Sequence, residues 1–528
     1  MIARMKKIII SLMGCLAVLT SCMKDLDQRP VTETESDATA VYNSVDGFRM
    51  VLAKLYASYS LVGQEKGGGN ADMASNNGQD FLRCYFNLQE APTDEVACTW
   101  LSGDKIEALT YMTWDANDPW VADGYYRLYY TIALCNEFLR HGSDADAFSE
   151  QDKATVATYM QEARFLRALA YWCVLDLFGQ GPFVDETMPV GAFKPAAYNS
   201  KQLFDYIESE LKALTLPGRT AVEYGRASEA AAWTLLARLY LNAEVYGAGD
   251  HYTDCITYCE KVRGAGYSLE GDWTKLFNAD NHLRTNEIIF PFVVDATHAV
   301  TWGATTYLVC GEVGNDNAQN PADYGLDKGW GMFRVRGELP ALFGDVASSK
   351  DGRCRFYTDG TTQWFTGNID NQSEGYFSEK WSNLKDDGSV ASASAENGVC
   401  TDWPFFRLAD VYLMEAEAQL RGGSGISRSD ARGLVNDLRQ RAYGNTLGNV
   451  ADGDFDLDFI LDERARELYH EAVRRTDLRR YGRLTTSSYV WQWKGGVLAG
   501  QAVDDKYNIY PIPAAELSAN TNLHNDKY

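Results

Sequence analysis

Three tryptophans stand in unusual surroundings in this sequence. Trp100, Trp302 and Trp330 each lie in a polar, glycine-containing segment rather than among other apolar residues. An indole can cover the apolar C–H face of a sugar ring while nearby polar groups bond the hydroxyls of that sugar. The three residues are therefore candidates for carbohydrate contacts, with ordinary core packing as the alternative.

Signatures of catalysis are absent from the sequence. The six histidines form no H-E-x-x-H pattern, and neither a G-x-S-x-G elbow nor a Walker loop occurs. Asp94 and Glu95 could supply part of a glycosidase carboxylate pair, but such a pair must meet in space across the scissile bond. Because the chain has 73 acidic residues, adjacent carboxylates also arise by chance. The sequence favours a binding protein over an enzyme, and it indicates no cofactor.

An acidic run near the C-terminus matches most of an EF-hand calcium loop. Asp452, Asp454, Asp456 and Glu463 have the required spacing, but Leu457 stands where the tight turn needs glycine. Acidic residues are also favourable at the N-terminus of a helix. We therefore interpret the run as the start of a helix and predict no metal there.

The segment from Asp462 to Arg483 is rich in arginine and is predicted to be helical. Glu467 and Glu471 interleave with its seven arginines, and Glu471 is spaced to pair with Arg475. An internal, ion-paired helix explains this pattern better than a phosphate-binding one. The net charge of −24 also argues against nucleic acid, whose backbone requires clustered cations.

The N-terminus has the form of a secretory signal. Three basic residues precede an apolar stretch from Ile8 to Thr20. This stretch is too short for a membrane-spanning helix, which needs about 20 residues. Leu19 to Cys22 then resembles a bacterial lipobox, with an incidental cysteine as the alternative. We expect a signal peptide over residues 1–21, a lipid on Cys22, and a flexible tether over 22–40. Two or more acyl chains give stable membrane anchoring.

The mature chain would hold nine further cysteines, an odd number without framework spacing. Several fall in apolar helical stretches and are expected to be buried as small hydrophobic residues. Cys255 and Cys259 lie one helical turn apart, and their pairing is left open.

Apolar periodicity and capping signals predict a mainly α-helical fold. Helices are expected over 149–178, 228–246, 252–262, 407–420 and 429–442, with Gly179 and Pro182 ending the first of them. Small residues at the helix crossings resemble tetratricopeptide-like units, which bury their faces by stacking. From about residue 266 to 405 we expect loops, short helices and few strands.

Several segments, in order along the chain, resemble the SusD/RagB family. They are Glu162–Tyr171 with Leu177–Gly179, Ala232–Tyr240, Phe406–Leu413 with Glu415–Ala418, Asn436–Ala442, Glu463–Leu468 with Asp477–Gly482, and the ending from Tyr510 to Tyr528. The resemblance covers nearly the whole mature chain. It implies a helical region over 41–264 and a second one over 265–528 that is intertwined with it.

The resemblance also implies a function. Members of this family are outer-membrane surface lipoproteins that cap a SusC-like, TonB-dependent transporter and pass oligosaccharides to it uncut. Local matches to the starch-binding founder of the family favour starch or another α-glucan as ligand. Trp100, Trp302 and Trp330 stand where the founder has its sugar-stacking aromatics, and Arg83 stands where it has an arginine that bonds sugar hydroxyls.

The chain departs from the founder at some positions. Trp302 replaces a tyrosine, Gly103 falls where an asparagine contacts sugar, and Cys98 replaces a second tryptophan. Of the founder's metal contacts only Asp402 is kept, beside His282 and Cys400, so no metal is expected. Two alternatives stay open: a lid or scaffold subunit with little glycan affinity of its own, and a protein for another glycan or a peptide cargo.

Overall fold

The computed structural model describes residues 38–74, 79–314, 319–392 and 398–528. It confirms a mainly helical protein with few strands. The predicted signal peptide, the lipid-bearing Cys22 and most of the tether lie outside the described residues. The last part of that predicted tether, from Ala38, already belongs to the short helix α2.

The helices follow one another from the N-terminus to the C-terminus. They are α2 (Ala38–Val41), α3 (Val45–Ser60), α4 (Phe81–Glu90), α5 (Glu107–Tyr111), α6 (Pro119–Arg140), α7 (Glu150–Phe178), α8 (Ser200–Ala213), α9 (Glu229–Leu241), α10 (Tyr252–Gly264), α11 (Ala304–Glu312), α12 (Glu338–Ala341), α13 (Leu408–Leu420), α14 (Arg428–Tyr443), α15 (Leu457–Leu468), α16 (Arg474–Arg480) and α17 (Ala514–Ala519). In the described parts of the chain, every helix is too short or too polar to span a bilayer.

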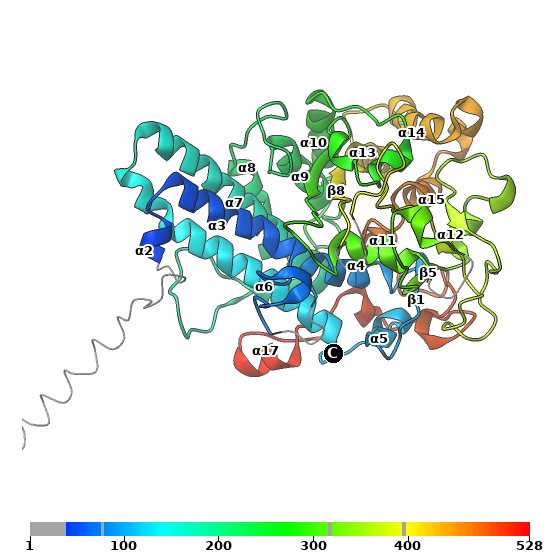
Figure 1. Ribbon diagram of the computed structural model, residues 1–528, viewed down its shortest axis with the longest axis horizontal. Coiled ribbons are helices and arrows are strands. Elements are labelled where there is room, and N and C mark those ends of the chain that lie inside the picture. Colours follow the sequence, from blue (N-terminus) through cyan, green and yellow to red (C-terminus); the bar gives the residue numbers. More distant parts are fainter. Residues whose placement is uncertain (1–37, 75–78, 315–318, 393–397) are drawn as a thin grey trace, which may run out of the picture.

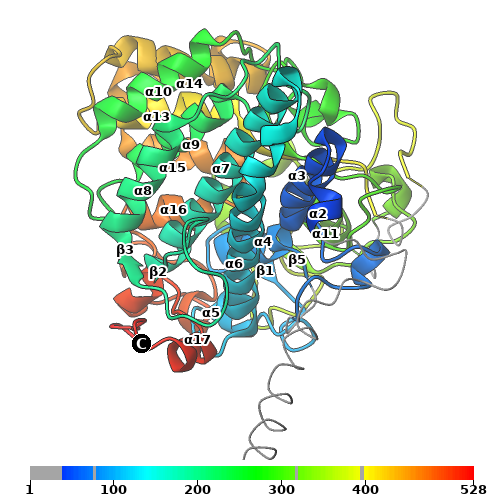
Figure 2. The same ribbon diagram turned by 90° about the vertical axis from the view of Figure 1, so that its left-hand side faces the viewer.

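The long helices pack in sequence as neighbours (Figures 1 and 2). Helix α6 packs against α7, α7 against α8, α9 against α10, and α10 against α13, which in turn contacts α14. Each amphipathic helix thus covers the apolar face of the next, as in stacked helical repeats. A regular repeat period, like the predicted boundary between residues 264 and 265, stays a prediction.

The strands form four separate antiparallel pairs in the described residues. These pairs are β1 (Val96–Cys98) with β5 (Phe333–Val335), β2 (Gln180–Pro182) with β3 (Ala197–Asn199), β4 (Ile288–Phe292) with β8 (Trp403–Arg407), and β6 (Phe356–Tyr357) with β7 (Phe377–Ser378). Except for β2 with β3, each pair joins segments that lie far apart or across long loops. The β1–β5 ribbon therefore fastens the loop-rich region to the helical scaffold.

Helix ends follow the capping signals closely. The Ser149 hydroxyl accepts a hydrogen bond from the backbone N–H of Asp152, and Gly179, with φ of 68°, ends α7. Ser228 caps α9 in the same way. This helix, however, ends at Leu241 and not at the predicted Tyr246. The Asn242 side-chain amide donates to the carbonyl of Arg238 at 2.9 Å, which satisfies the last turn and stops the helix.

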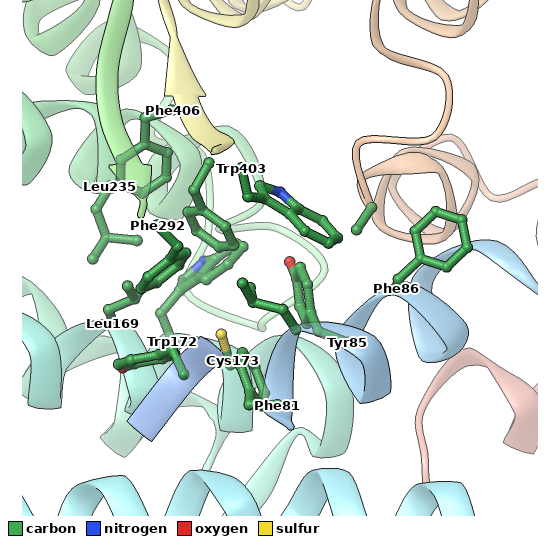
Figure 3. Close-up of a cluster of buried hydrophobic side chains, with 14 of the residues drawn as sticks. Phe81, Tyr85, Phe86, Leu169, Trp172, Cys173, Leu235, Phe292, Trp403 and Phe406 are labelled. Atoms are coloured by element: carbon green, nitrogen blue, oxygen red, sulfur yellow. The ribbon is translucent and has the colours of Figure 1, made fainter. Parts of the chain in front are cut away.

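Aromatic residues from distant segments meet in the core (Figure 3). Trp172 of α7 and Tyr85 of α4 lie near Phe292 of β4 and near Trp403 and Phe406 of β8. All five side chains are at most 2% exposed. Burial of each large apolar side chain stabilises the fold by about 1.5–3 kcal/mol. The core thus joins the helical scaffold to the strands of the loop-rich region.

The arginine-rich segment is internal and ion-paired, as predicted, but it is not one helix. It divides into α15 and α16, and the link between them includes His470 and Ala472 with φ of 59° and 62°. Glu471 pairs with Lys380 and Arg407 at 2.6 and 2.7 Å, so the predicted pair with Arg475 is wrong. Because Glu471 pairs with Lys380 and Arg407, which lie outside this segment, its side chain does not face Arg475 as it would in one continuous helix.

The acidic run before α15 caps that helix, as predicted. The Asp456 carboxylate accepts a hydrogen bond from the backbone N–H of Phe459 at 2.8 Å. Glu463 lies inside α15 and is fully buried, with Arg353 at 2.8 Å. The residue that would close a calcium loop is therefore committed to an internal ion pair.

The nine cysteines between residues 84 and 400 are free. Seven are buried, and Cys354 and Cys400 are half-buried, which agrees with their predicted role as small hydrophobic residues. Cys255 and Cys259 form no disulfide.

Candidate functional site

The β1–β5 ribbon brings two of the three candidate tryptophans together. Trp100 follows β1 and Trp330 precedes β5, and the antiparallel pairing continues beyond the strands. The backbone N–H of Thr99 donates to the carbonyl of Met332 at 2.9 Å, and the Thr99 hydroxyl donates to Gly331 at 3.1 Å. The segments that bear Trp100 and Trp330 are therefore held side by side, although the bonded residues Thr99 and Gly331 are 232 positions apart in the sequence.

Trp330 is further fixed by helix α11. Its backbone N–H donates to the carbonyl of Cys310 at 2.7 Å, and the N–H of Met332 donates to Gly311 at 3.0 Å. The Trp330 side chain is half-buried, and it packs against the main core. Part of one ring is thus left at the surface on a rigid support.

Trp302 lies just before α11 and is 48% exposed, while Trp100 is 42% exposed. One face of the Trp302 ring rests on Gly67, where an added Cβ would lie 2.9 Å from Cζ2. Gly67 has φ of 64°, a conformation that suits glycine. The close approach leaves the other face of the indole open to solvent.

Arg83 connects these segments from below the surface. Its guanidinium donates to both carboxylate oxygens of Asp104 at 2.9 and 3.1 Å and to the carbonyl of Trp302 at 3.4 Å. It also stacks over the Tyr307 ring, with 4.2 Å from Cζ to the ring centroid. Asp104 in turn donates its backbone N–H to the carbonyl of Trp100 at 2.9 Å. A chain of contacts therefore runs from Trp100 through Arg83 to Trp302.

This geometry bears on the predicted role of Arg83. The residue is only 5% exposed, and two of its three guanidinium nitrogens bond to protein. The arrangement supports a positioning role for Arg83, while direct bonding to a ligand stays a prediction. Asp104 was not singled out from the sequence, because nothing in its local pattern marks an acidic residue four positions after Trp100 as its partner.

The turn that carries Trp302 is tied to the start of α4. The Asp80 carboxylate caps α4 through the backbone N–H of Arg83 at 2.9 Å. The same carboxylate accepts from the Thr301 hydroxyl at 2.6 Å and from the backbone N–H of Ala304 at 3.2 Å. The buried Asp80 side chain thus fixes the position of the turn that bears Trp302 relative to the start of the helix that bears Arg83.

Two departures from the expected pattern have clear structural settings. Cys98 is 1% exposed and faces the core from β1, so it contributes nothing to the surface. Gly103 is exposed, and a Cβ added there would meet no atom within 4 Å. The surface beside Trp100 therefore has room for a larger side chain than the one present.

Asp402 is committed to protein contacts. Its carboxylate accepts from the backbone N–H of Val294 at 2.8 Å and from the Tyr224 hydroxyl at 2.7 Å. Burial raises the pKa of Asp402 to about 6. Within the described ranges, His282, Cys400 and Asp402 are not part of any group of three or more His, Cys, Asp or Glu side chains placed to hold a metal ion. The absence of a metal stays a prediction.

The carboxylates of Asp94 and Glu95 are also internal. Asp94 is 3% exposed, with Arg474 at 2.7 Å and the Tyr489 hydroxyl at 2.6 Å. Burial alone would raise the pKa of Asp94, but the positive charge of Arg474 outweighs it and lowers that pKa. Burial raises the pKa of Glu95 to about 8. Neither carboxylate reaches the surface, so the two cannot flank a glycosidic bond.

We call Trp100, Trp302 and Trp330, of which the first two are exposed and the third is half-buried, the tryptophan surface. Two cavities of about 460 and 320 Å³ lie elsewhere, and neither has one of the three tryptophans in its lining. Flat, half-exposed rings on a rigid base are suited to shallow contacts with a large ligand, not to enclosure of a small one.

Comparisons with known proteins agree with this architecture. A family model described as the SusD family matches residues 313–528. The starch-binding protein SusD of Bacteroides thetaiotaomicron is 33% identical over 558 aligned positions, which cover 96% of this chain and 95% of that protein. The SusD-like protein P25 of Formosa agariphila is 27% identical and covers 88% of this chain and 87% of its own length.

Solved structures show the same fold. A SusD homolog from Bacteroides thetaiotaomicron superimposes with a TM-score of 0.71 at 19% identity, covering 94% of this chain and all of that one. The surface glycan-binding protein A of the same organism, in complex with laminarihexaose, gives 0.69 at 17% identity, covering 92% and 99%. The 33% identity to SusD extends over nearly the full length of both chains. Together with the fold, it shows that this chain belongs to the SusD/RagB family.

Proposed function

We propose that this protein binds neutral polysaccharide, with α-glucan such as starch as the favoured ligand, on the tryptophan surface. One observation supports the proposal: hydrogen bonds of Thr99, Arg83 and Asp104 tie together the distant segments that bear the three tryptophans. The starch-binding relative at 33% identity supports α-glucan over other glycans. The glycan-binding structural neighbour is too distant in sequence to inform the choice.

Stacking on an indole supplies the affinity in this proposal. A sugar that covers one ring face removes roughly 60 Å² of apolar surface from water, which gives about 1.5 kcal/mol or tenfold in affinity. Three such contacts on an open surface give modest affinity per site, because much of each sugar stays hydrated. The relative tilt of the three rings would select the shape of the bound chain.

The proposal extends to location and partner. Cys22 would anchor the protein in the outer membrane, and the bound oligosaccharide would pass uncut to a SusC-like, TonB-dependent transporter. No catalytic step is assigned to the protein. Asp94 and Glu95 are buried, and Asp94 is paired with Arg474. A lid or scaffold subunit with little glycan affinity, or a carrier of another glycan or of peptide, is the competing proposal.

Affinity electrophoresis tests the proposal directly. The mature form without Cys22 should be retarded in gels that contain amylopectin, and not in gels with levan, xylan or mucin glycans. Replacing both exposed rings, with Trp100→Ala and Trp302→Ala, should weaken binding about 100-fold at tenfold per ring.

A matched control is Trp233→Ala, which removes a partly exposed tryptophan from α9, away from the β1–β5 ribbon (Figure 1). This variant should keep wild-type retardation. Unchanged retardation of the Trp100/Trp302 double variant would place glycan binding elsewhere. If no glycan retards the wild-type protein, the result would favour the scaffold or the peptide-cargo proposal.

A further inference from the structure

A fourth tryptophan, which the sequence did not mark as a candidate, is as exposed as Trp100 and Trp302. Trp364 is 44% exposed, and in the described part of the chain only Trp100 and Trp302 are comparably exposed tryptophans. It lies in the loop between β6 and β7, outside the tryptophan surface. A single exposed apolar ring is common on protein surfaces, so the support and the surroundings of Trp364 decide whether it has a role.

The Trp364 indole lies flat against backbone. A Cβ added at Gly337 would lie 2.1 Å from Cε3 and 2.5 Å from Cδ2 of this ring, so only glycine allows the approach. The neighbouring Gln363 side chain donates to the Gly337 carbonyl at 2.8 Å. One face of the indole is thus covered by main chain, and the other face is left to the solvent.

Trp302 is supported in the same manner by Gly67. In both places a half-exposed indole rests on a glycine from a distant segment. This support fixes the ring without covering its outer face. A ring fixed in this way loses little conformational entropy when a ligand stacks on it.

The loop that carries Trp364 is well anchored. Gln492 clamps Phe365 through two hydrogen bonds, one from the Phe365 backbone N–H at 3.0 Å and one to its carbonyl at 2.8 Å. Arg334 donates to the carbonyl of Ile369 at 2.6 Å. Phe365 and Ile369 pack with Ala97 in a small core of their own. The platform is therefore as rigid as the ribbon beneath it.

The chemistry around the ring suits an uncharged carbohydrate. Residues 358–376 contain no lysine or arginine, so an anionic ligand would find no counter-charge on this loop. Instead the loop is rich in hydroxyl and amide side chains, which exchange hydrogen bonds with sugar hydroxyls. They include Thr358, Thr361 and Asn368, whereas Gln363, Thr366 and Asn371 already bond to Gly337 or Glu374.

Trp364 is separated from the tryptophan surface by the length of the β1–β5 ribbon. The backbone N–H of Arg336 donates to the carbonyl of Glu95 at 3.0 Å, so Gly337 lies at the opposite end of the ribbon from Trp100. Seven residues at about 3.3 Å each would span at most roughly 23 Å from Trp330 to Gly337, and the bend at Gly331, with φ of 57°, shortens that path. A polysaccharide chain is long enough to reach both places.

We propose that Trp364 is a second platform for neutral glycan, separate from the tryptophan surface, through which one polysaccharide chain is held at two points. This inference rests on the proposed function. Two linked weak contacts raise the affinity for a polymer without changing the affinity of the first site for a short oligosaccharide. The ligand class is the same neutral glucan.

Two measurements test the platform. The first compares Trp364→Ala with wild type in amylopectin gels and in calorimetry with maltotriose. We expect amylopectin affinity to fall about tenfold, the contribution of one stacked ring, with maltotriose affinity at the tryptophan surface unchanged. Trp364→Phe, which keeps a ring on Gly337, should retain most of the polymer binding, and equal melting temperatures would show that the loop stays folded.

The second measurement observes the ring itself. In protein labelled with 5-fluorotryptophan, the ¹⁹F resonance that disappears in Trp364→Phe belongs to Trp364. It should shift on titration with maltotriose in the Trp100→Ala, Trp302→Ala background, where the first site is disabled.

The outcomes separate the two proposals. If amylopectin retards wild type and Trp364→Ala equally, and the Trp364 resonance does not move, the second platform is wrong while the tryptophan surface stands. If the Trp364 resonance shifts but the Trp100/Trp302 double variant binds amylopectin as wild type does, the second platform stands and the first site is wrong. If Trp364→Ala binds glycan normally but no longer co-purifies with the transporter barrel, the ring is a protein contact and the inference fails.

Discussion

At the scale of single residues, the position of Arg83 distinguishes two ways of supporting a binding surface. A donor to the ligand must reach solvent, whereas a positioning residue is buried between the groups it holds. Arg83 is buried, and its bidentate pair with Asp104 fixes the segment of Trp100. Lysine has no planar fork and cannot hold Asp104 and the Trp302 carbonyl in the same geometry.

We therefore predict that Arg83→Lys and Asp104→Asn weaken amylopectin binding to a similar extent, about tenfold each. Isothermal titration with maltoheptaose measures this effect, and thermal melting checks the fold. A direct donor role predicts a different pattern, in which Arg83→Lys loses binding while Asp104→Asn does not. That result would contradict the positioning role.

At the scale of secondary-structure elements, α15 is held by buried charges. Glu467 bonds to Arg353 and Arg407 at 2.9 and 2.7 Å and also to Arg441, and all of these side chains are at most 4% exposed. Removing one charge from such a network leaves the others buried and uncompensated. Exposed pairs, by contrast, contribute little.

Glu467→Gln should therefore lower the free energy of unfolding by about 3–5 kcal/mol. The control is Glu150→Gln, whose partner Lys153 is exposed and whose loss should cost under about 1 kcal/mol. Guanidinium denaturation of both variants gives the comparison. Equal stability of the two variants would show that the network adds nothing beyond a surface pair.

The neighbouring Glu463 predicts how this element responds to acid. Burial opposes its charge, but Arg353, Arg439 and Arg466 outweigh it and lower the pKa of Glu463 from 4.5 to about 2. Its contribution to stability is therefore complete above the unfolded pKa near 4.5 and is lost as the pH falls toward 2. The stability difference between wild type and Glu463→Gln should shrink over that range.

Local signals predict these elements well, and long-range contacts explain what they miss. Ser149, Gly179, Ser228 and Asp456 act within one helical turn, so the sequence reveals them. The break at His470 depends on Lys380 and Arg407, and the depth of Arg83 depends on Trp302, none of which is near in sequence. Trp364 could have been noticed, since it stands among threonines and glycines as the other three tryptophans do. The support of its ring by Gly337 could not have been predicted, because Gly337 lies in a different segment of the chain.

At the scale of the whole molecule, the two regions expected from the sequence share their most important contacts. Strand β1 pairs with β5, α10 packs on α13, and α4 contacts α16, all across the expected boundary at residues 264 and 265. The tryptophan surface itself draws Trp100 from the first region and Trp302 and Trp330 from the second. Neither region holds a complete site.

Separate expression of residues 41–264 and 265–528 should accordingly give no folded, glycan-binding fragment. Circular dichroism melting and size-exclusion chromatography of each fragment provide the measurement, with the intact mature chain as reference. Cooperative melting of 41–264 alone would establish an independent domain and contradict this expectation.

The pairing of Thr99 with Met332 has a consequence for when the protein becomes active. Contacts between segments so distant in the chain form late in folding, after the intervening loop has closed. An unfolded chain has no tryptophan surface, because the segments that form it are not yet joined. On the proposed function, sugar affinity would then arise in a single step at the end of folding, and a partly folded chain would not bind glycan.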